Sequence, residues 1–218
     1  MRSPRRTKTK WVLLAVGIAV LALACMNSYL YVRFIRPWHL TWGATDLEVS
    51  RGMPGDGIVT DPTFDATRAV TIDATPQEIW PWIVQMGFGR AGWYSYDWID
   101  NLGRPSARTI LPEHQRIEIG DMIPIDPAER RGFWVKGFVH GQWILWGDRA
   151  GNVTWCWGLY PIDDGSTRLV TRVKVKYDWM RPSIFFNIVF DVGDIVMMRR
   201  CLHGIRDRAE SRTPFSKY

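Results

Sequence analysis

Residues 153–177, VTWCWGLYPIDDGSTRLVTRVKVKY, contain two strand-like runs joined by a turn at Asp163-Asp164-Gly165. In the second run, basic side chains alternate with apolar or hydroxyl side chains. This alternation predicts a strand with one face in water and the other face covered. The predicted wet face holds Arg172, Lys174 and Lys176, and the covered face holds Thr171, Val173, Val175 and Tyr177.

Similar short runs lie on the N-terminal side of this pair, separated by turns at His140-Gly141 and at residues 148–152. Strands at such short spacing, joined by hairpins, predict a curved antiparallel sheet in an α+β fold. The predicted strands are residues 66–72, 117–125, 133–139, 142–146, 153–160 and 167–177.

Helices are predicted after the first strand and at the end of the chain. The sequence TPQE at residues 75–78 has the spacing of a capping box with a proline at the first helical position, so a helix should begin there. A short second helix is expected at residues 96–102. Residues 182–212 carry an apolar stripe and predict a long helix. Asp191 and Asp194 argue against a second membrane span, because a central aspartate costs about 3 kcal/mol on insertion.

An uncharged run lies near the N-terminus. Residues 11–32 number 22, which at about 1.5 Å per residue cross the ~30 Å core of a bilayer once. The bases before this run predict a cytoplasmic N-terminus and a domain on the outer side of the cell membrane. Because residues 43–65 are rich in Gly, Pro and Asp, they are interpreted as a linker. The predicted parts are a basic tail (1–10), a transmembrane helix (11–32), a juxtamembrane segment and linker (33–63), a folded domain (64–212) and a C-terminal tail (213–218).

A cleaved signal peptide is the alternative to a retained anchor. A basic region, an apolar run and Ala22-Leu23-Ala24 fit the small-x-small cleavage pattern. Apolar and aromatic residues continue through Val32, past the end of an ordinary signal peptide, which favours the anchor. Cys25 matches a lipoprotein site poorly, because Ala22 stands where such sites usually have leucine.

The net charge of +6 in 218 residues arises from the N-terminal tail. The chain has 28 Lys and Arg against 22 Asp and Glu, and the first ten residues hold five of these bases and no acid. The nearly neutral remainder argues against a nucleic-acid partner. The run GFGRAG at residues 87–92 matches G-x-G-x-x-G, but it follows a helix and does not lead from a strand into one. We interpret it as a turn and expect no nucleotide.

Metal and catalytic motifs are missing from the sequence. The four histidines have no metal-ligand spacing, and no nucleophile elbow, zincin motif or Walker loop occurs. We therefore expect no metal, no cofactor and no assembled catalytic set. Cys156 and Cys201 are expected as buried thiols, with a disulfide in an oxidising compartment as the alternative.

The densest aromatic and acidic cluster is WYSYDWID at residues 93–100. Its rings suit the wall of an apolar pocket, and its hydroxyls and carboxylates suit a polar group of a ligand. Simple packing beneath the sheet is the alternative. Strand alternation places Trp155 and Trp157 on the same face of the sheet, where they belong either to the core or to the wall of a pocket. The candidate ligand-binding residues are Trp93, Tyr94, Tyr96, Asp97, Trp155 and Trp157.

Four stretches carry a family resemblance: ATRAVTIDATPQEIWPWIVQMGFGRAGWYSYDWIDN (66–101), GDMIP (120–124), TWCWGLYPIDDGSTRLVTRVKV (154–175) and VMMRRCLHGIRDRAE (196–210). Residues 64–212 resemble the SRPBCC superfamily, which includes START-like lipid carriers and polyketide cyclases/dehydrases. The resemblance is closest to bacterial members with a similar YSYDW stretch. It implies a helix-grip fold, in which a curved antiparallel sheet wraps around a long C-terminal helix and two short helices follow the first strand. It also implies a cavity between sheet and helix, and no shared catalytic residue.

We therefore expect a membrane-anchored binding module that holds a lipid or other apolar small molecule in that cavity. One alternative is a cyclase or dehydrase that uses Tyr96, Asp97 or His114 as acid or base. The other alternative is an assembly protein without catalysis.

Overall fold

The computed structural model describes residues 4–162, 165–177 and 184–211. The chain divides into two compact units, Met1–His39 and Leu40–Tyr218. The first unit consists of helix, and the second holds the sheet with its covering helices.

The first unit is helical throughout its described length. Helix α1 (Pro4–Leu30) continues through the π-helical turn η1 (Tyr31–Ile35) into α2 (Arg36–Leu40). Within this run, Lys10–Leu40 is long and apolar enough to cross a membrane. The predicted span 11–32 lies inside it, and the described part of the predicted tail is helical as well.

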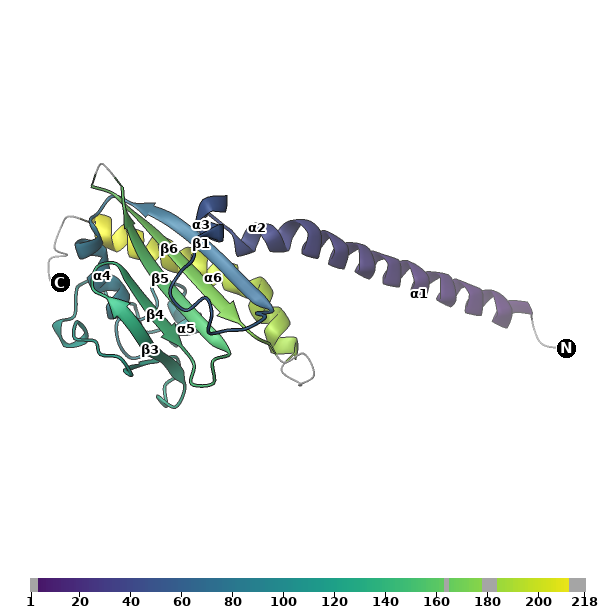
Figure 1. Cartoon of the computed structure of the whole chain (residues 1–218). Coiled ribbons are helices and arrows are strands. Elements are labelled where there is room, and N and C mark those ends of the chain that lie inside the picture. Colours follow the sequence, from purple (N-terminus) through teal and green to yellow (C-terminus); the bar gives the residue numbers. More distant parts are fainter. Residues whose placement is uncertain (1–3, 163–164, 178–183, 212–218) are drawn as a thin grey trace. The chain divides into compact units, whose positions relative to one another are not determined.

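The second unit is built on a six-stranded sheet with the order β1-β6-β5-β4-β3-β2, in which every neighbouring pair is antiparallel (Figure 1). All six predicted strands are present. The second is shorter than predicted, because residues before it form a turn in which Glu118 N–H donates to Asp121 Oδ2 at 2.8 Å. The strands are β1 (Phe64–Ile72), β2 (Met122–Pro124), β3 (Gly132–Val139), β4 (Trp143–Gly147), β5 (Val153–Pro161) and β6 (Thr167–Val175).

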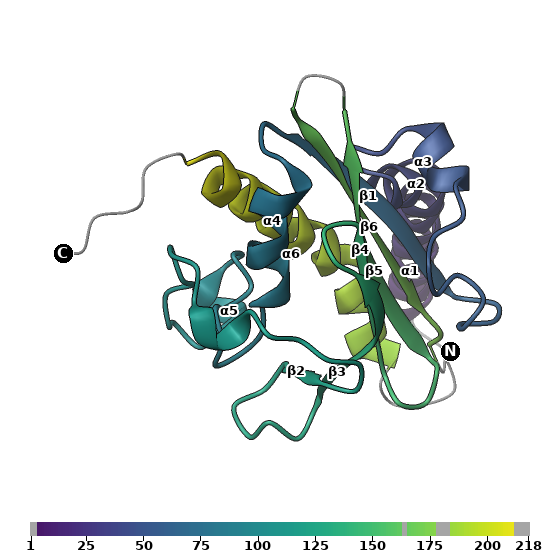
Figure 2. The same cartoon turned by 60° about the vertical axis from the view of Figure 1, so that its left-hand side comes forward.

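Helices α4 (Pro76–Val84) and α6 (Ile184–Glu210) lie together on one face of the sheet, which we call the inner face (Figure 2). The predicted cap of α4 is present, since Glu78 Oε2 accepts hydrogen bonds from the Thr75 N–H and hydroxyl, both at 2.8 Å. Helix α5 (Asp97–Asp100) and the 3₁₀ turn η2 (Pro112–His114) follow α4. The predicted first two residues of the terminal helix, its last residue Arg212 and the C-terminal tail fall outside the described residues. This arrangement of sheet and long helix is the helix-grip fold.

The terminal helix packs on the sheet and is not a second membrane span, as expected from the two aspartates in its sequence. Asp194 of α6 forms an ion pair with Arg68 of β1, with 2.5 Å between Oδ2 and Nη1, and the Arg68 side chain is almost fully buried. The Arg68 guanidinium also lies 5.8 Å from the ring of Phe64 on the same strand. Both charges are thus neutralised inside the core, where an unpaired charge would be strongly destabilising.

The outer face of the sheet is covered around Arg172 and Lys174, so the prediction that these two side chains are solvated was wrong, whereas Lys176 is exposed as predicted. Residues 41–63, which include α3 (Asp46–Ser50) and which we call the outer strap, pack against it. The Arg172 side chain, predicted to be solvated, is only 5% exposed. Its guanidinium donates to Thr67 Oγ1, Asp56 Oδ2 and the strap carbonyls of Glu48, Val49 and Arg51 at 2.7–2.9 Å.

Residues 43–63 therefore belong to the folded unit and do not form a free linker. Arg168 of β6 donates to both carboxylate oxygens of Glu48, at 2.7 and 3.0 Å, and to the Gly43 carbonyl. At Gly43, φ is +75° and a side chain would overlap the Ala69 carbonyl, so the strap can approach the sheet only with glycine there. The strap is held by arginine hydrogen bonds and by the packing of Met53 in the apolar cluster of the outer face, and neither contact requires a periodic sequence.

Cys156 and Cys201 are free buried thiols, as predicted. Cys156 packs in the apolar cluster of the outer face, whereas Cys201 packs in the core under α6. The sheet lies between them. Burial raises the pKa of the Cys156 thiol to about 12 and also raises the pKa of Cys201, so both are protonated near neutral pH.

Candidate functional site

Four tryptophans meet on the inner face of the sheet, and we call them the tryptophan cluster: Trp93, Trp146, Trp155 and Trp157. The Trp93 ring stacks on Trp155 with 5.8 Å between centroids and 12° between planes. Trp155 and Trp157 lie 4.9 Å apart, and Trp146 lies edge-on to Trp157 at 5.8 Å. Phe133 of β3 contacts Trp155 edge-on at 5.4 Å. Aromatic side chains thus fill this part of the space between sheet and helices.

Strand register builds three members of the cluster. Trp146 of β4 pairs directly with Trp155 of β5, and Trp157 lies two residues further along the same face. Trp93 reaches the cluster from the turn after α4. In that turn, Gly87 and Gly92 exchange two backbone hydrogen bonds of 3.1 Å. The glycine run is a turn, as predicted from its position after a helix.

Two indole N–H groups in the cluster have no hydrogen-bond acceptor within the described residues. They belong to Trp146 and Trp157, whose side chains are fully buried. Trp155 differs, since its Nε1–H donates to Thr171 Oγ1 at 2.8 Å. A buried donor without an acceptor costs about 1–3 kcal/mol. The cluster therefore holds two donors that would gain from an acceptor inside an otherwise apolar site.

Tyr94 lies apart from the cluster, although the sequence placed it in the same candidate site. Its hydroxyl donates to the Trp82 carbonyl at 3.0 Å and accepts from Gln85 Nε2 at 2.9 Å. The Arg208 guanidinium lies 4.3 Å above its ring. Burial raises the pKa of Tyr94 well above its usual value. These contacts give Tyr94 a structural position between α4 and α6.

Asp97 and Tyr96 also lie outside the tryptophan cluster. The Asp97 carboxylate accepts from the Ser106 N–H at 3.0 Å and from the Ser106 hydroxyl at 2.5 Å, which ties α5 to the following loop. Tyr96 is the partly exposed residue before α5. Of the six predicted binding residues, the structure brings together only Trp93, Trp155 and Trp157.

The three candidate acid–base residues of the enzyme alternative do not form a linked set. No hydrogen bond joins Tyr96, Asp97 and His114 in the part of the chain that the structure describes. His114 lies in η2, where burial and then the charge of Arg90 lower its pKa.

Trp146 and Phe133 are members of the site that the sequence reasoning missed. Strand alternation places both side chains on the inner face of the sheet. Their cross-strand neighbours, however, depend on the register of β3, β4 and β5. The irregularity between Val135 and Gly137 shifts that register in β3. The usable signal for Trp146 was the short turn at 148–152, which fixes its pairing with Trp155.

A cavity of about 440 Å³ lies elsewhere, beside the start of α4 and the β3–β4 turn. None of the six predicted binding residues lines it. Its walls come from Pro76, Gln77, Gly141, Gln142, Trp143, Leu159, Tyr160 and Pro161.

Asp100 provides a pH-dependent test of the packing around α5. Burial first, and then the nearby charge of Asp97, raise the pKa of Asp100 from 3.8 to about 6. The folded state therefore binds this proton more tightly than the unfolded state. The stability that Asp100 contributes is fully present below pH 3.8 and is lost as the pH rises through about 6. We expect Asp100→Asn to flatten the pH dependence of the unfolding temperature in that window.

Thermal unfolding of the full chain in detergent at several pH values measures this effect. Asp207→Asn is the matched control, because Asp207 is an exposed carboxylate of α6. The unfolding temperature of this control should depend on pH as that of the unmodified protein does. If the Asp100→Asn variant also shows the pH dependence of the unmodified protein, the raised pKa of Asp100 is contradicted.

Comparison with known proteins gives no family assignment. No family model matches the chain, and no curated protein matches it. Solved structures match at low identity. A conserved protein of unknown function from Enterococcus faecalis is 10% identical, with 73% of this chain and 77% of that chain covered and a TM-score of 0.43. The KanY protein is 15% identical, with 70% and 100% covered and a TM-score of 0.41. A Polyketide_cyc-like protein from Corynebacterium glutamicum is 15% identical, with 71% and 97% covered and a TM-score of 0.36.

Proposed function

We propose that this chain is a membrane-anchored binding protein of the SRPBCC type, whose helix-grip domain holds an apolar small molecule or lipid at the tryptophan cluster. The observation that carries the proposal is the pair of buried, unpartnered indole N–H groups of Trp146 and Trp157. Aromatic faces bind an apolar body, and an indole N–H binds an acceptor such as a carbonyl oxygen. The ligand class is therefore an apolar molecule that carries a hydrogen-bond acceptor.

Entry of such a ligand requires the Trp93 ring to move, because this ring is stacked on Trp155. Trp93 follows the glycine turn directly, and Gly89 and Gly92 have φ values of +73° and +77°. Glycine adopts these φ values at little cost, so the turn holds the Trp93 backbone in place, and entry of the ligand needs a rotation of the Trp93 side chain. Trp155 and Phe133 are only partly buried, and they mark the side from which the ligand enters.

The apolar helix of the first unit supports membrane attachment. Residues 11–32 lack charge, and five bases precede them. We propose a single span with the N-terminus in the cytoplasm and the binding domain on the outer side of the cell membrane. The anchor would hold the domain within reach of lipids and of apolar molecules dissolved in them.

The proposed binding site predicts a specific effect of removing one indole N–H. Trp157→Phe keeps an aromatic ring but deletes the donor, so it should weaken binding by about tenfold, which corresponds to one lost hydrogen bond. The measurement uses the full chain in detergent. Native mass spectrometry identifies molecules that co-purify, and titration with 8-anilinonaphthalene-1-sulfonate, an aromatic sulfonate, gives an affinity.

Trp134→Phe is the matched control. Trp134 lies on β3, where the Arg149 guanidinium is 4.7 Å from its ring, outside the tryptophan cluster and outside the 440 Å³ cavity. Its replacement should leave binding unchanged. Equal effects of the two substitutions, or no binding of the probe and no co-purifying molecule, would contradict a ligand site at the cluster.

A further inference from the structure

Helix α5 presents apolar side chains to solvent. Trp98 is 74% exposed, Ile99 is 45% exposed and Leu102 is 66% exposed; we call these three residues the α5 tip. The helix is held from beneath, because the Ser95 hydroxyl donates to the Met197 carbonyl of α6 at 3.0 Å. The polar side chain of Asp100 is directed inward, with both carboxylate oxygens buried. The tip thus points away from the body of the unit.

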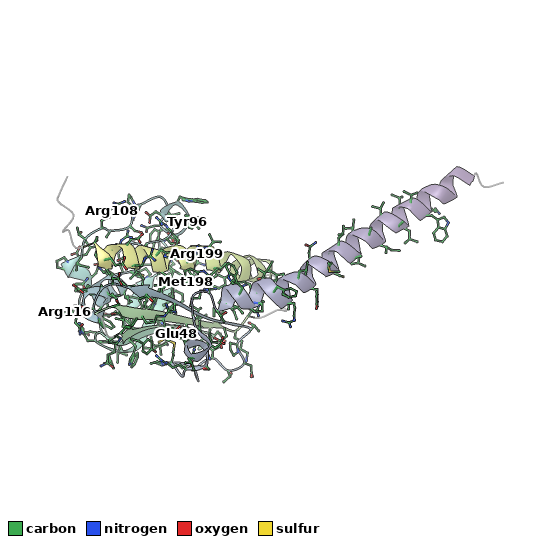
Figure 3. All side chains as sticks on the ribbon, turned by 90° about the horizontal axis from the view of Figure 1, so that it is seen from above. Glu48, Tyr96, Arg108, Arg116, Met198 and Arg199 are labelled. Carbon is green, nitrogen blue, oxygen red and sulfur yellow. The ribbon has the colours of Figure 1, made fainter. Side chains whose placement is uncertain are left out.

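Exposed arginines lie near this apolar tip. Arg104 and Arg108 follow it in the chain, and Arg200 lies on α6 three residues after Met197. Arg199 belongs to another side of α6, because its guanidinium lies 5.2 Å from the Trp42 ring. Figure 3 shows Tyr96 and Arg108 on one side of α6 and Glu48 of the outer strap on the other. The Ser106 hydrogen bonds do not remove the charge of Asp97, and the Asp100 oxygens are buried, so the arginines outnumber the acids beside the tip. The surface combines an apolar tip with a net positive rim of Arg104, Arg108 and Arg200.

We propose that the α5 tip and its arginine rim form a membrane-docking surface for a bilayer with anionic headgroups. Tryptophan and leucine partition into the membrane interface, while arginines bind lipid phosphates and keep their charge in water. The proposal rests on the membrane anchor of the proposed function, which holds this unit beside a bilayer. It adds a second contact, made by the folded unit itself.

Two features favour a lipid surface over a second copy of this chain. Three apolar side chains are far fewer than the ~20–30 residues that each partner contributes to a stable protein interface. In a two-fold dimer the same patch would face itself, so arginines such as Arg104 and Arg108 would be brought against their own copies. An anionic bilayer instead offers the complementary charge.

Hydrogen exchange of the full chain in nanodiscs tests the proposal. The α5 amides donate within one helical turn, for example Ile99 N–H to the Tyr96 carbonyl at 2.8 Å, so they should open readily in detergent. In nanodiscs that contain phosphatidylglycerol and carry one copy of the protein each, we expect the backbone amides of residues 97–104 to exchange on the order of tenfold more slowly than in detergent. Discs of phosphatidylcholine alone should give weaker protection.

Variants separate the apolar and charged contributions. Trp98→Ser with Leu102→Ser should abolish the added protection, and Arg108→Glu with Arg200→Glu should abolish the preference for anionic lipid. Ile119→Ser is the control, because Ile119 is 71% exposed but lies outside the patch. In this variant, residues 97–104 should keep their added protection in anionic discs. Unfolding temperatures verify that each variant folds.

Three results would overturn the proposal: no added protection in anionic discs, equal protection in neutral discs, or protection only in discs that carry two copies. The last result would show self-association. Ligand binding is measured separately in detergent, so a failure here is distinguishable from a failure of the tryptophan site.

Discussion

Replacing Arg172 by methionine is expected to lower the free energy of unfolding by about 3–5 kcal/mol, although the sequence pattern marks this residue as solvated. The guanidinium contacts three carbonyls of the outer strap and the Asp56 carboxylate. Methionine fills much of the space but leaves these acceptors buried without donors. The strap should then detach from β6 and become accessible to protease.

Lys176→Met is the control for this prediction, because it removes a basic side chain that directly follows the same strand. Lys176 is exposed, and within the described residues its ammonium group donates to the Thr60 carbonyl at 3.0 Å. Its replacement should change stability by no more than about 0.5 kcal/mol. Urea unfolding of the full chain in detergent, with limited proteolysis of residues 48–61, measures both variants. Similar losses for Arg172→Met and Lys176→Met would contradict the structural role of Arg172.

Gly204→Ala should destabilise the protein by about 3 kcal/mol, although alanine normally favours a helix. A methyl group at Gly204 would overlap the Tyr94 carbonyl oxygen and lie 2.8 Å from Tyr94 Cβ. Backbone atoms form most of this contact and cannot move aside as a flexible side chain can. The segment that carries Trp93 and Tyr94 would have to separate from α6.

The same helix offers a control in Gly193→Ala. A methyl group at Gly193 would meet no atom of the described residues within 4 Å. This variant should therefore gain up to about 1 kcal/mol from helix propensity. Thermal unfolding of the full chain in detergent should move in opposite directions for the two substitutions. A shift in the same direction would show that propensity, and not the Tyr94 contact, controls position 204.

Local signals predicted much of the fold. The capping box at residues 75–78 begins α4 where expected, and strand alternation places Trp155 and Trp157 on the inner face. Asp191 and Asp194 correctly identified the terminal helix as part of the folded domain. These features depend on residues close together in the chain, so spacing alone carries the information.

The candidate site was predicted only in part. Trp93 joins the tryptophan cluster, whereas its neighbour Tyr94 turns away with φ at +57° and packs between helices. Sequence proximity suggested one site for residues 93–97, but successive side chains in an irregular segment point in different directions. Trp146 joined the cluster through register with Trp155, which residue type does not reveal.

The amino-acid sequence by itself determined the order of elements, the apolar N-terminal helix and the near-neutral charge of the remainder, because periodicity, length and composition are local properties. Tertiary structure alone decided which sheet face is covered and which tryptophans meet. Alternation in β6 assigned Arg172 to water, yet a segment more than a hundred residues earlier supplies its acceptors. A buried arginine and a solvated one have the same sequence pattern, and only the arrangement of distant carbonyls distinguishes them.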